Sequence, residues 1–123
     1  MLNLLLPADP RRAQLAQLCR QGKRRLVARQ YPCDWHPGTV LNRLSGEVYT
    51  ESAAFEAIAR ALEDPGIEVT ALVLRTPPGK VAYEFCIPQG KDRPPIYVKV
   101  QLGMGCVLAR SFHYSDFAVK PYE

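Results

Sequence analysis

The stretch that decides the fold is "IYVKVQLGMGCVLARSFHYS", residues 96–115. Apolar and polar side chains alternate over 96–102, which is the period of a strand with one buried face. Gly103 and Gly105 favour a tight turn, and a second expected strand, "CVLARSF", follows over 106–112. The stretch therefore predicts an antiparallel hairpin.

The length of the turn decides which side chains share a face. A two-residue turn places Tyr97 opposite Arg110, whereas a three-residue turn places it opposite Ser111. The three-residue turn buries Leu108 and Phe112 but also places Arg110 on the apolar face. A one-residue slip moves all apolar side chains of a strand to the other face of the sheet, so we favour the register that buries Leu108 and Phe112. This register predicts one polar surface on the sheet, made of Tyr97, Lys99, Gln101, Ser111 and His113.

Two further strands are expected before the hairpin, within 67–74 and 80–87, with short connections rich in Gly and Pro. Short connections join antiparallel neighbours. Residues 8–22 and 49–66 have helical apolar spacing. We therefore predict an α+β fold in which two N-terminal helices pack on one face of a four-stranded antiparallel meander.

The expected order is a helical half at 8–64, a β-meander at 67–113 and a C-terminal tail at 114–123. Together these parts form a single domain over 1–123, since a chain of 123 residues supports one core.

Capping residues set the limits of the expected helices. Asp9 caps the first helix and Gly22 supplies a left-handed stop. Thr50 or Ser52 caps the second helix. Residues 31–48 predict an ordered loop with a short helical turn near 40–44.

The positive charge is concentrated after the first helix. The chain carries a formal charge of +4, and "RQGKRRLVARQ", residues 20–30, holds much of it. Clustered cations are typical of a surface that binds a nucleic-acid backbone. The simpler alternative is a solvated helix end whose cations offset the helix dipole. On the first interpretation the RNA-binding residues are Arg20, Lys23, Arg24, Arg25 and Arg29, with Gln101, Ser111 and Tyr114 from the hairpin.

Several classes of protein are not indicated. The apolar run in "MLNLLLPADP" is too short for a signal peptide, and no segment approaches a membrane span. The four cysteines lack metal spacing, so we expect reduced thiols and a cytoplasmic protein. Cys33, Asp34 and His36 have ligand chemistry, and His113 could complete a set, but no second pair is present. No metal and no cofactor is predicted.

Four residues of the hairpin form a candidate catalytic group. His113 carries an imidazole, a type of group that can give or take a proton in a phosphoryl-transfer step. Tyr97 is a second candidate for proton transfer, and Lys99 with Arg110 can stabilise charge on a phosphate. Each also has an ordinary interpretation as a solvated residue on an exposed strand.

Residues 94–115, "PPIYVKVQLGMGCVLARSFHYS", resemble the C-terminal hairpin of the MqsR branch of RelE-like mRNA interferase toxins. In that family a strand of the type "VYLK" turns back into a strand that ends in "SF" and a basic residue. Tyr97 matches the strand tyrosine, and His113 matches the basic residue. The resemblance implies a RelE-like fold and a metal-independent endoribonuclease that cleaves mRNA. It also implies a cognate antitoxin as partner, and the ribosome as a possible one.

Two alternatives stay open. One is a non-catalytic nucleic-acid-binding domain that stacks bases on Tyr83, Tyr97 and Tyr114. The other is a protein-interaction module that uses a sheet edge and the tail.

Overall fold

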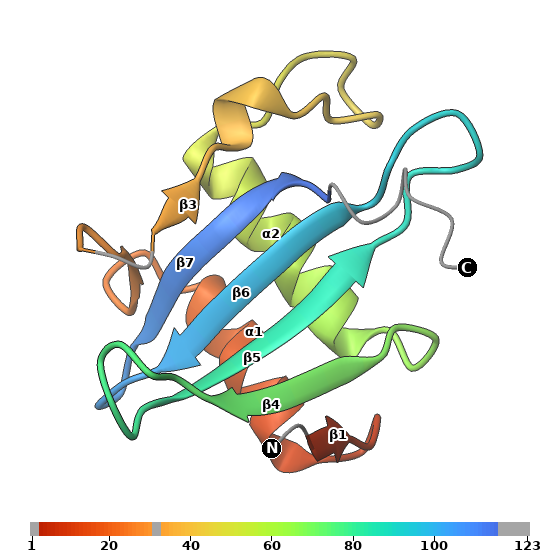
Figure 1. Ribbon diagram of the computed structural model, residues 1–123. Helices are drawn as coiled ribbons and strands as arrows, with labels where there is room; N and C mark the ends of the chain where they lie inside the picture. Colours follow the sequence, from red (N-terminus) through yellow and green to blue (C-terminus); the bar gives the residue numbers. More distant parts are fainter. Residues whose placement is uncertain (1–2, 31–32, 116–123) are drawn as a thin grey trace.

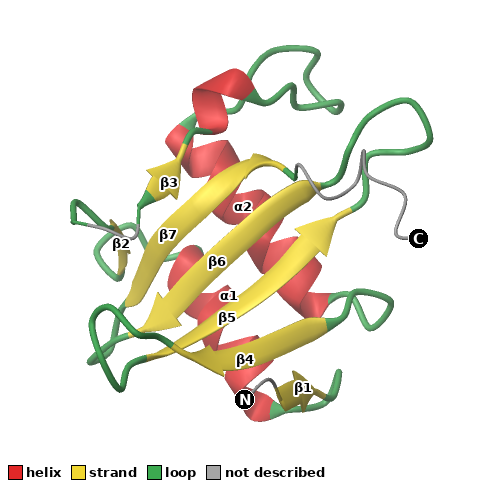
Figure 2. Ribbon diagram, viewed as in Figure 1, coloured by secondary structure: helices red, strands yellow, loops and turns green. Residues whose placement is uncertain are grey.

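Two helices cover one face of a mixed sheet in the computed structural model, which describes residues 3–30 and 33–115 (Figure 1; Figure 2). The helices are α1 (Pro10–Cys19) and α2 (Glu51–Glu63), with a short 3-10 helix, η1 (Pro37–Thr39). The strands are β1 (Asn3–Leu5), β2 (Arg25–Val27), β3 (Asp34–Trp35), β4 (Val69–Val73), β5 (Val81–Ile87), β6 (Ile96–Leu102) and β7 (Val107–Tyr114).

The sheet contains the predicted meander and three strands more. β4, β5, β6 and β7 pair antiparallel in chain order, as expected. The predicted count of four is wrong, because the described part of the chain forms a seven-stranded sheet. β1 pairs antiparallel with β4, while β2 and β3 both pair parallel with β7. These added strands have only two or three residues, too few for a period to be read from sequence.

A β-bulge at Arg110 replaces both predicted registers of the hairpin. The last pair is Leu102 with Val107, so the connection has the four residues 103–106. Lys99 pairs with Ser111, but Val100 pairs with Ala109, which leaves Arg110 as the extra residue. Two predictions are corrected by this bulge. Tyr97 lies opposite His113 rather than Ser111, and Arg110 joins the polar face.

The bulge also reassigns the apolar side chains of β7. Leu108 pairs with Gln101 on the polar face and is not part of the core. Val107 and Ala109 are buried under the helices in its place, and Phe112 is buried there as predicted.

The predicted caps are confirmed at both helix starts. Asp9 Oδ1 accepts the backbone N–H of Arg11 at 2.9 Å. The Arg11 side chain also donates to this carboxylate, and the pKa of Asp9 falls to about 2. Thr50, not Ser52, caps α2 and accepts the N–H of Ala53 at 3.1 Å. Gly22 is not the left-handed stop that was predicted, because α1 ends at Cys19 with Arg20 as its C-cap and Gly22 has no positive φ.

The short helical turn predicted within the loop 31–48 is present, but it lies earlier in the chain than expected. The helical turn expected near 40–44 is the 3-10 helix η1, three residues earlier. Pro37 at its first position fits the fixed φ of proline.

Arg12 ties the two helices together. It is 1% exposed, and its guanidinium donates to the carbonyl oxygens of Leu62 at 2.9 Å and Asp64 at 2.8 Å. A cation at the C-terminus of α2 also offsets the helix dipole. Burial lowers the pKa of this guanidinium.

The core between helices and sheet anchors β3. Trp35 packs at 5.1 Å from Phe55 of α2 and at 5.5 Å from Phe112 of β7, measured between ring centroids. Since neighbouring residues of a strand point to opposite faces, Asp34 and His36 lie on the face without helices. The packing of one aromatic ring thus positions two polar side chains for the site.

Candidate active site

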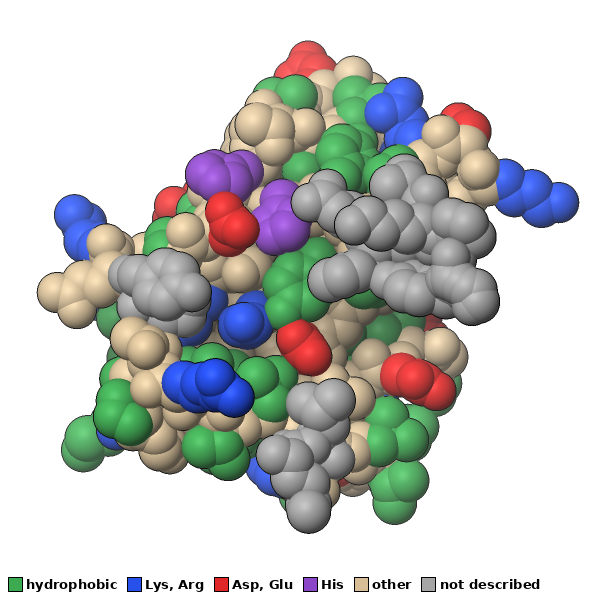
Figure 3. Space-filling view, in the orientation of Figure 1, with side chains coloured by type: hydrophobic (Ala, Val, Ile, Leu, Met, Phe, Trp, Pro, Cys, Tyr) green, Lys and Arg blue, Asp and Glu red, His purple; other side chains and the backbone are tan. Residues whose placement is uncertain are grey.

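Polar side chains form a row across the sheet face that carries no helix. Glu84, Lys99 and Ser111 are cross-strand partners on β5, β6 and β7, and Asp34 of β3 lies beside Ser111. Figure 3 shows this face, where histidine side chains gather beside an acidic group and close to cations. We call Asp34, His36, Glu84, Tyr97, Lys99 and His113 the open-face cluster.

The five side chains predicted to share a surface do share it. The register puts Tyr97, Lys99 and Gln101 on the same face as Ser111 and His113. They differ in accessibility, because Gln101 is 7% exposed and Ser111 5%. These two form an inner layer, while Tyr97, Lys99 and His113 reach the solvent in part.

Arg110 belongs to the inner layer. Its side chain is 5% exposed, and its Nε donates to Gln101 Oε1 at 2.8 Å. Burial lowers the pKa of the guanidinium. In this position Arg110 supplies positive potential from beneath the surface rather than an exposed phosphate contact.

His113 is held in one tautomer by the backbone. Its Nδ1 lies 2.8 Å from the carbonyl oxygen of Tyr114. A carbonyl oxygen only accepts, so Nδ1 carries the proton. Nε2 lies 3.6 Å from Asp34 Oδ2, and the side chain is 27% exposed. In the neutral ring Nε2 has a lone pair that can accept a proton, and the imidazolium formed in this way would make an ion pair with Asp34.

Asp34 lies between the two histidines of the chain. Its Oδ1 is 3.1 Å from Nε2 of His36, while its Oδ2 faces His113. The backbone N–H of His36 donates to the carbonyl oxygen of Phe112 at 2.9 Å, which fixes this segment beside β7. Sequence reasoning considered Asp34 and His36 only as metal ligands. The alternation "DWH", with an apolar tryptophan between two polar residues, was the signal that both polar side chains face away from the core.

The Tyr97 hydroxyl donates a hydrogen bond to Glu84 Oε2 at 2.5 Å. Burial, and next this bond, raise the pKa of Tyr97 far above its ordinary value. The phenol therefore stays protonated near neutral pH and cannot serve as a base. Its ring lies 5.5 Å from the ring of His113 between centroids, tilted by 43°, which restricts the imidazole orientation.

Lys99 is the cation nearest the middle of the row. It lies between Glu84 and Ser111 in the pairing of the strands and is half-buried. An ammonium in this place favours a bound anion beside His113.

Two arginines of the basic run form contacts with other residues of the protein. Arg20 forms ion pairs with Glu56 at 3.2 Å and Glu63 at 2.5 Å. Arg25 donates to Ser52 Oγ at 3.0 Å, and its guanidinium lies 5.3 Å from the Phe55 ring centroid. The exposed remainder is Lys23, Arg24 and Arg29.

Two of the three tyrosines considered for base stacking are not available for it. Tyr83 is 4% exposed and belongs to the core under the helices. The Tyr114 hydroxyl accepts the backbone N–H of Leu41 at 3.1 Å, and the side chain packs against the core. Tyr97 alone of these three faces the open side of the sheet. The tail beyond Ser115, proposed as a partner-binding segment, lies outside the described residues.

Within 3–30 and 33–115 no group of three or more His, Cys, Asp or Glu side chains has the geometry of a metal site. Cys33 is turned to the backbone, where its thiol lies 2.8 Å from the carbonyl oxygen of Ala28. The same part of the chain has no helix long and apolar enough to cross a membrane.

The fold and the site define an α+β protein with helices on one face of a mixed sheet and a His–Asp–His arrangement on the other. Comparison with known protein families, curated proteins and solved structures gives no match for this chain. The function of the protein is therefore inferred from the chemistry of the open-face cluster.

Proposed function

We propose that the protein is a metal-independent endoribonuclease whose active site is the open-face cluster. The observation that carries this proposal is the Asp34 carboxylate with one imidazole on each oxygen, His36 at 3.1 Å and His113 at 3.6 Å. Cleavage of RNA through its own 2′-hydroxyl needs one base, one acid and a cation for the phosphate. Two imidazoles and Lys99 supply these three groups.

His113 is the proposed base. Its protonated Nδ1 is occupied by the Tyr114 carbonyl, which leaves Nε2 to remove the proton of the 2′-hydroxyl. The 2′-oxygen then attacks the adjacent phosphorus, and the bond to the 5′-oxygen breaks. Tyr97 keeps the imidazole ring in place and takes no part in proton transfer.

His36 is the proposed acid. Its Nε2 is held by Asp34, and its Nδ1 has no partner among the described residues. In the imidazolium form, Nδ1–H delivers the proton to the leaving 5′-oxygen. Lys99 stabilises the charge that develops on the phosphate.

The resemblance of the hairpin to RelE-like mRNA interferases supports mRNA as the substrate. On this proposal the fold is a RelE-like sheet extended by β1, β2 and β3, and the protein acts in the cytoplasm beside a cognate antitoxin. The resemblance to that family also implies the ribosome as a partner in cleavage. The exposed cations Lys23, Arg24 and Arg29 would bind the RNA backbone outside the site.

Incubation with a long labelled RNA in EDTA tests the proposal, with and without purified ribosomes. We expect the wild-type protein to produce discrete fragments in at least one of the two conditions. His113→Ala and His36→Ala should each lower the rate by about 100-fold or more, since an acid or a base contributes roughly that much. Lys91→Ala, at an exposed loop position, is the matched control and should cleave normally. Intact RNA in both conditions, or full activity of His113→Ala, would contradict the proposal.

A further inference from the structure

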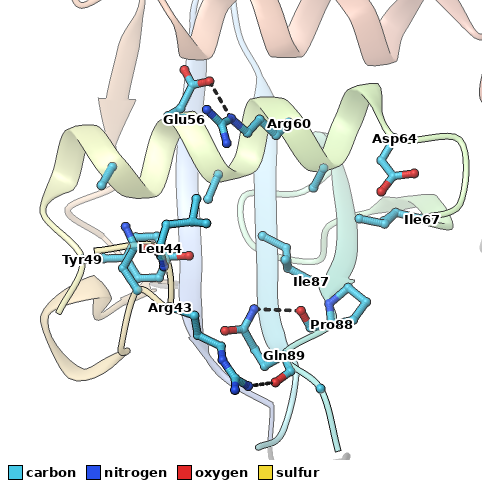
Figure 4. Close-up of a pocket in the computed structure, with 15 residues that line it drawn as sticks. Arg43, Leu44, Tyr49, Glu56, Arg60, Asp64, Ile67, Ile87, Pro88 and Gln89 are labelled. Atoms are coloured by element: carbon cyan, nitrogen blue, oxygen red, sulfur yellow. Dashed lines mark hydrogen bonds and ion pairs between the residues drawn. The ribbon is translucent and has the colours of Figure 1, made fainter. Parts of the chain in front are cut away.

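A second site lies on the opposite side of the sheet, along α2. A cavity of about 680 Å³ separates this helix from the segment 87–90 and from the loop after η1 (Figure 4). Its helical wall presents Ala53, Ala57 and Ala61, which are spaced four residues apart and leave the groove open. Ile87 and Tyr49 line it as well. Its volume is in the range of pockets that bind small molecules.

The charged groups at this cavity are already engaged. Glu56 bonds to Arg60 at 3.1 Å and to Arg20 at 3.2 Å, and Arg43 pairs with Asp92 at 3.1 Å. Asp64 Oδ1 accepts the backbone N–H of Gly66 at 2.8 Å. Three of the charged side chains that line the cavity, Arg43, Glu56 and Arg60, are thus already in ion pairs, which favours a neutral ligand.

One polar atom at the cavity lacks a partner. Gln89 is 9% exposed, and its Nε2 donates to the carbonyl oxygen of Pro88 at 2.8 Å. That bond assigns the amide orientation and leaves Oε1, which is buried and accepts no hydrogen bond from any described residue. Buried acceptors in proteins nearly always have a donor. Figure 4 shows this amide between the Arg43 guanidinium and Ile87. The terminal torsion of a glutamine is soft, so a rotation that exchanges the bond to Pro88 for a ligand contact can turn the oxygen toward the cavity.

We propose that the α2 cavity binds a neutral, mainly apolar small molecule that donates one N–H or O–H hydrogen bond to Gln89 Oε1. The alanine stripe and Ile87 would contact its carbon skeleton. A helical peptide fits less well, because its main-chain N–H groups are paired within the helix and cannot satisfy this acceptor. The site is separate from the open-face cluster and does not depend on the proposed nuclease activity.

Two probes that differ by one donor test this inference on the full chain. Titration of ¹⁵N-labelled protein with 2-naphthol should shift the amide resonances of the cavity, including Ala57 and Gln89. 2-Methoxynaphthalene has the same ring system without the O–H donor and should bind about 10-fold more weakly, the effect of one lost hydrogen bond. Gln89→Leu should remove the difference between the probes.

A steric variant with a matched control completes the test. Ala57→Phe should fill the cavity and abolish binding of both probes. Ala13→Phe, on the exposed side of α1, should bind as the wild-type protein does. The inference is overturned if neither probe shifts the cavity resonances, if both bind the wild-type protein equally, or if Ala57→Phe still binds. A groove that ignores both probes but binds an apolar peptide would be a protein-docking surface instead.

Discussion

At the scale of the residue, Asp34 organises the candidate active site although it does not touch the proposed substrate atoms. It is 62% exposed, yet both of its oxygens face an imidazole. Its carboxylate orients His36 through a hydrogen bond and faces the Nε2 of His113. In that arrangement Asp34 is a positioning residue.

Replacement of Asp34 separates positioning from folding. Asp34→Asn keeps the size of the side chain but loses the charge, so we expect kcat for RNA cleavage to fall about 10- to 100-fold with KM unchanged. Asp92→Asn, also exposed, is the control and should not change kcat. An Asp34→Asn protein with normal kcat across the pH range would show that the carboxylate has no role.

At the scale of the element, the link between α1 and α2 depends on a buried cation. Arg12 donates to three carbonyl oxygens at the end of α2, those of Ala61, Leu62 and Asp64, while its own side chain is 1% exposed. Removal of the guanidinium takes the side-chain donor from the buried carbonyl oxygen of Leu62, whereas the carbonyl oxygen of Asp64 keeps the backbone N–H of Ile67. Such losses destabilise proteins strongly.

Urea unfolding measures this link directly. Arg12→Met should lower the free energy of unfolding by about 2–4 kcal/mol, as hydrogen bonds from a charged donor are lost. Arg75→Met, at an exposed position, should change it by no more than ~0.5 kcal/mol. Equal unfolding midpoints of Arg12→Met and the wild-type protein would show that the link does not stabilise the fold.

The bulge in β7 shows how far the elements could be predicted from sequence. The alternation in 96–102 was enough to predict β6 and its polar face. β7 has Val107 and Ala109 at odd positions but Phe112 at an even one, so no unbroken register buries all three. An inserted residue at Arg110 resolves this conflict. Sequence reasoning instead adjusted the turn length and therefore assigned Leu108 and Arg110 to the wrong faces.

The short parallel strands explain what was missed at the site. β2 and β3 form because they pair with the edge of β7. This pairing depends on tertiary structure, and a segment of two or three residues has no sequence pattern that predicts it. His113 could be predicted as a site residue because it lies in a long, periodic strand. His36 and Asp34 could not be joined to it, since their position depends on the packing of Trp35 against Phe55 and Phe112.

At the scale of the whole molecule, the sheet separates two sites. The open-face cluster lies on the side without helices, while the α2 cavity lies between the sheet and the helix layer. The two sites share no residue. They should therefore respond to substitution independently.

A crossed pair of variants tests that independence. Ala57→Phe should lose 2-naphthol binding but cleave RNA at the wild-type rate. His113→Ala should lose cleavage but bind 2-naphthol with unchanged affinity. Loss of both properties in either variant would mean that the two faces are coupled, or that the variant is unfolded, which its amide spectrum would reveal.

Cleavage through the ribose 2′-hydroxyl is the central claim, and one substrate pair tests it most directly. An RNA containing the cleaved site, and the same molecule with 2′-deoxyribose on the 5′ side of the cleaved bond, are incubated with the wild-type protein in EDTA, with ribosomes if these are required. We predict fragments ending in a 2′,3′-cyclic phosphate from the first substrate and no cleavage of the second at that bond. Cleavage of both substrates, or of neither, would contradict the account.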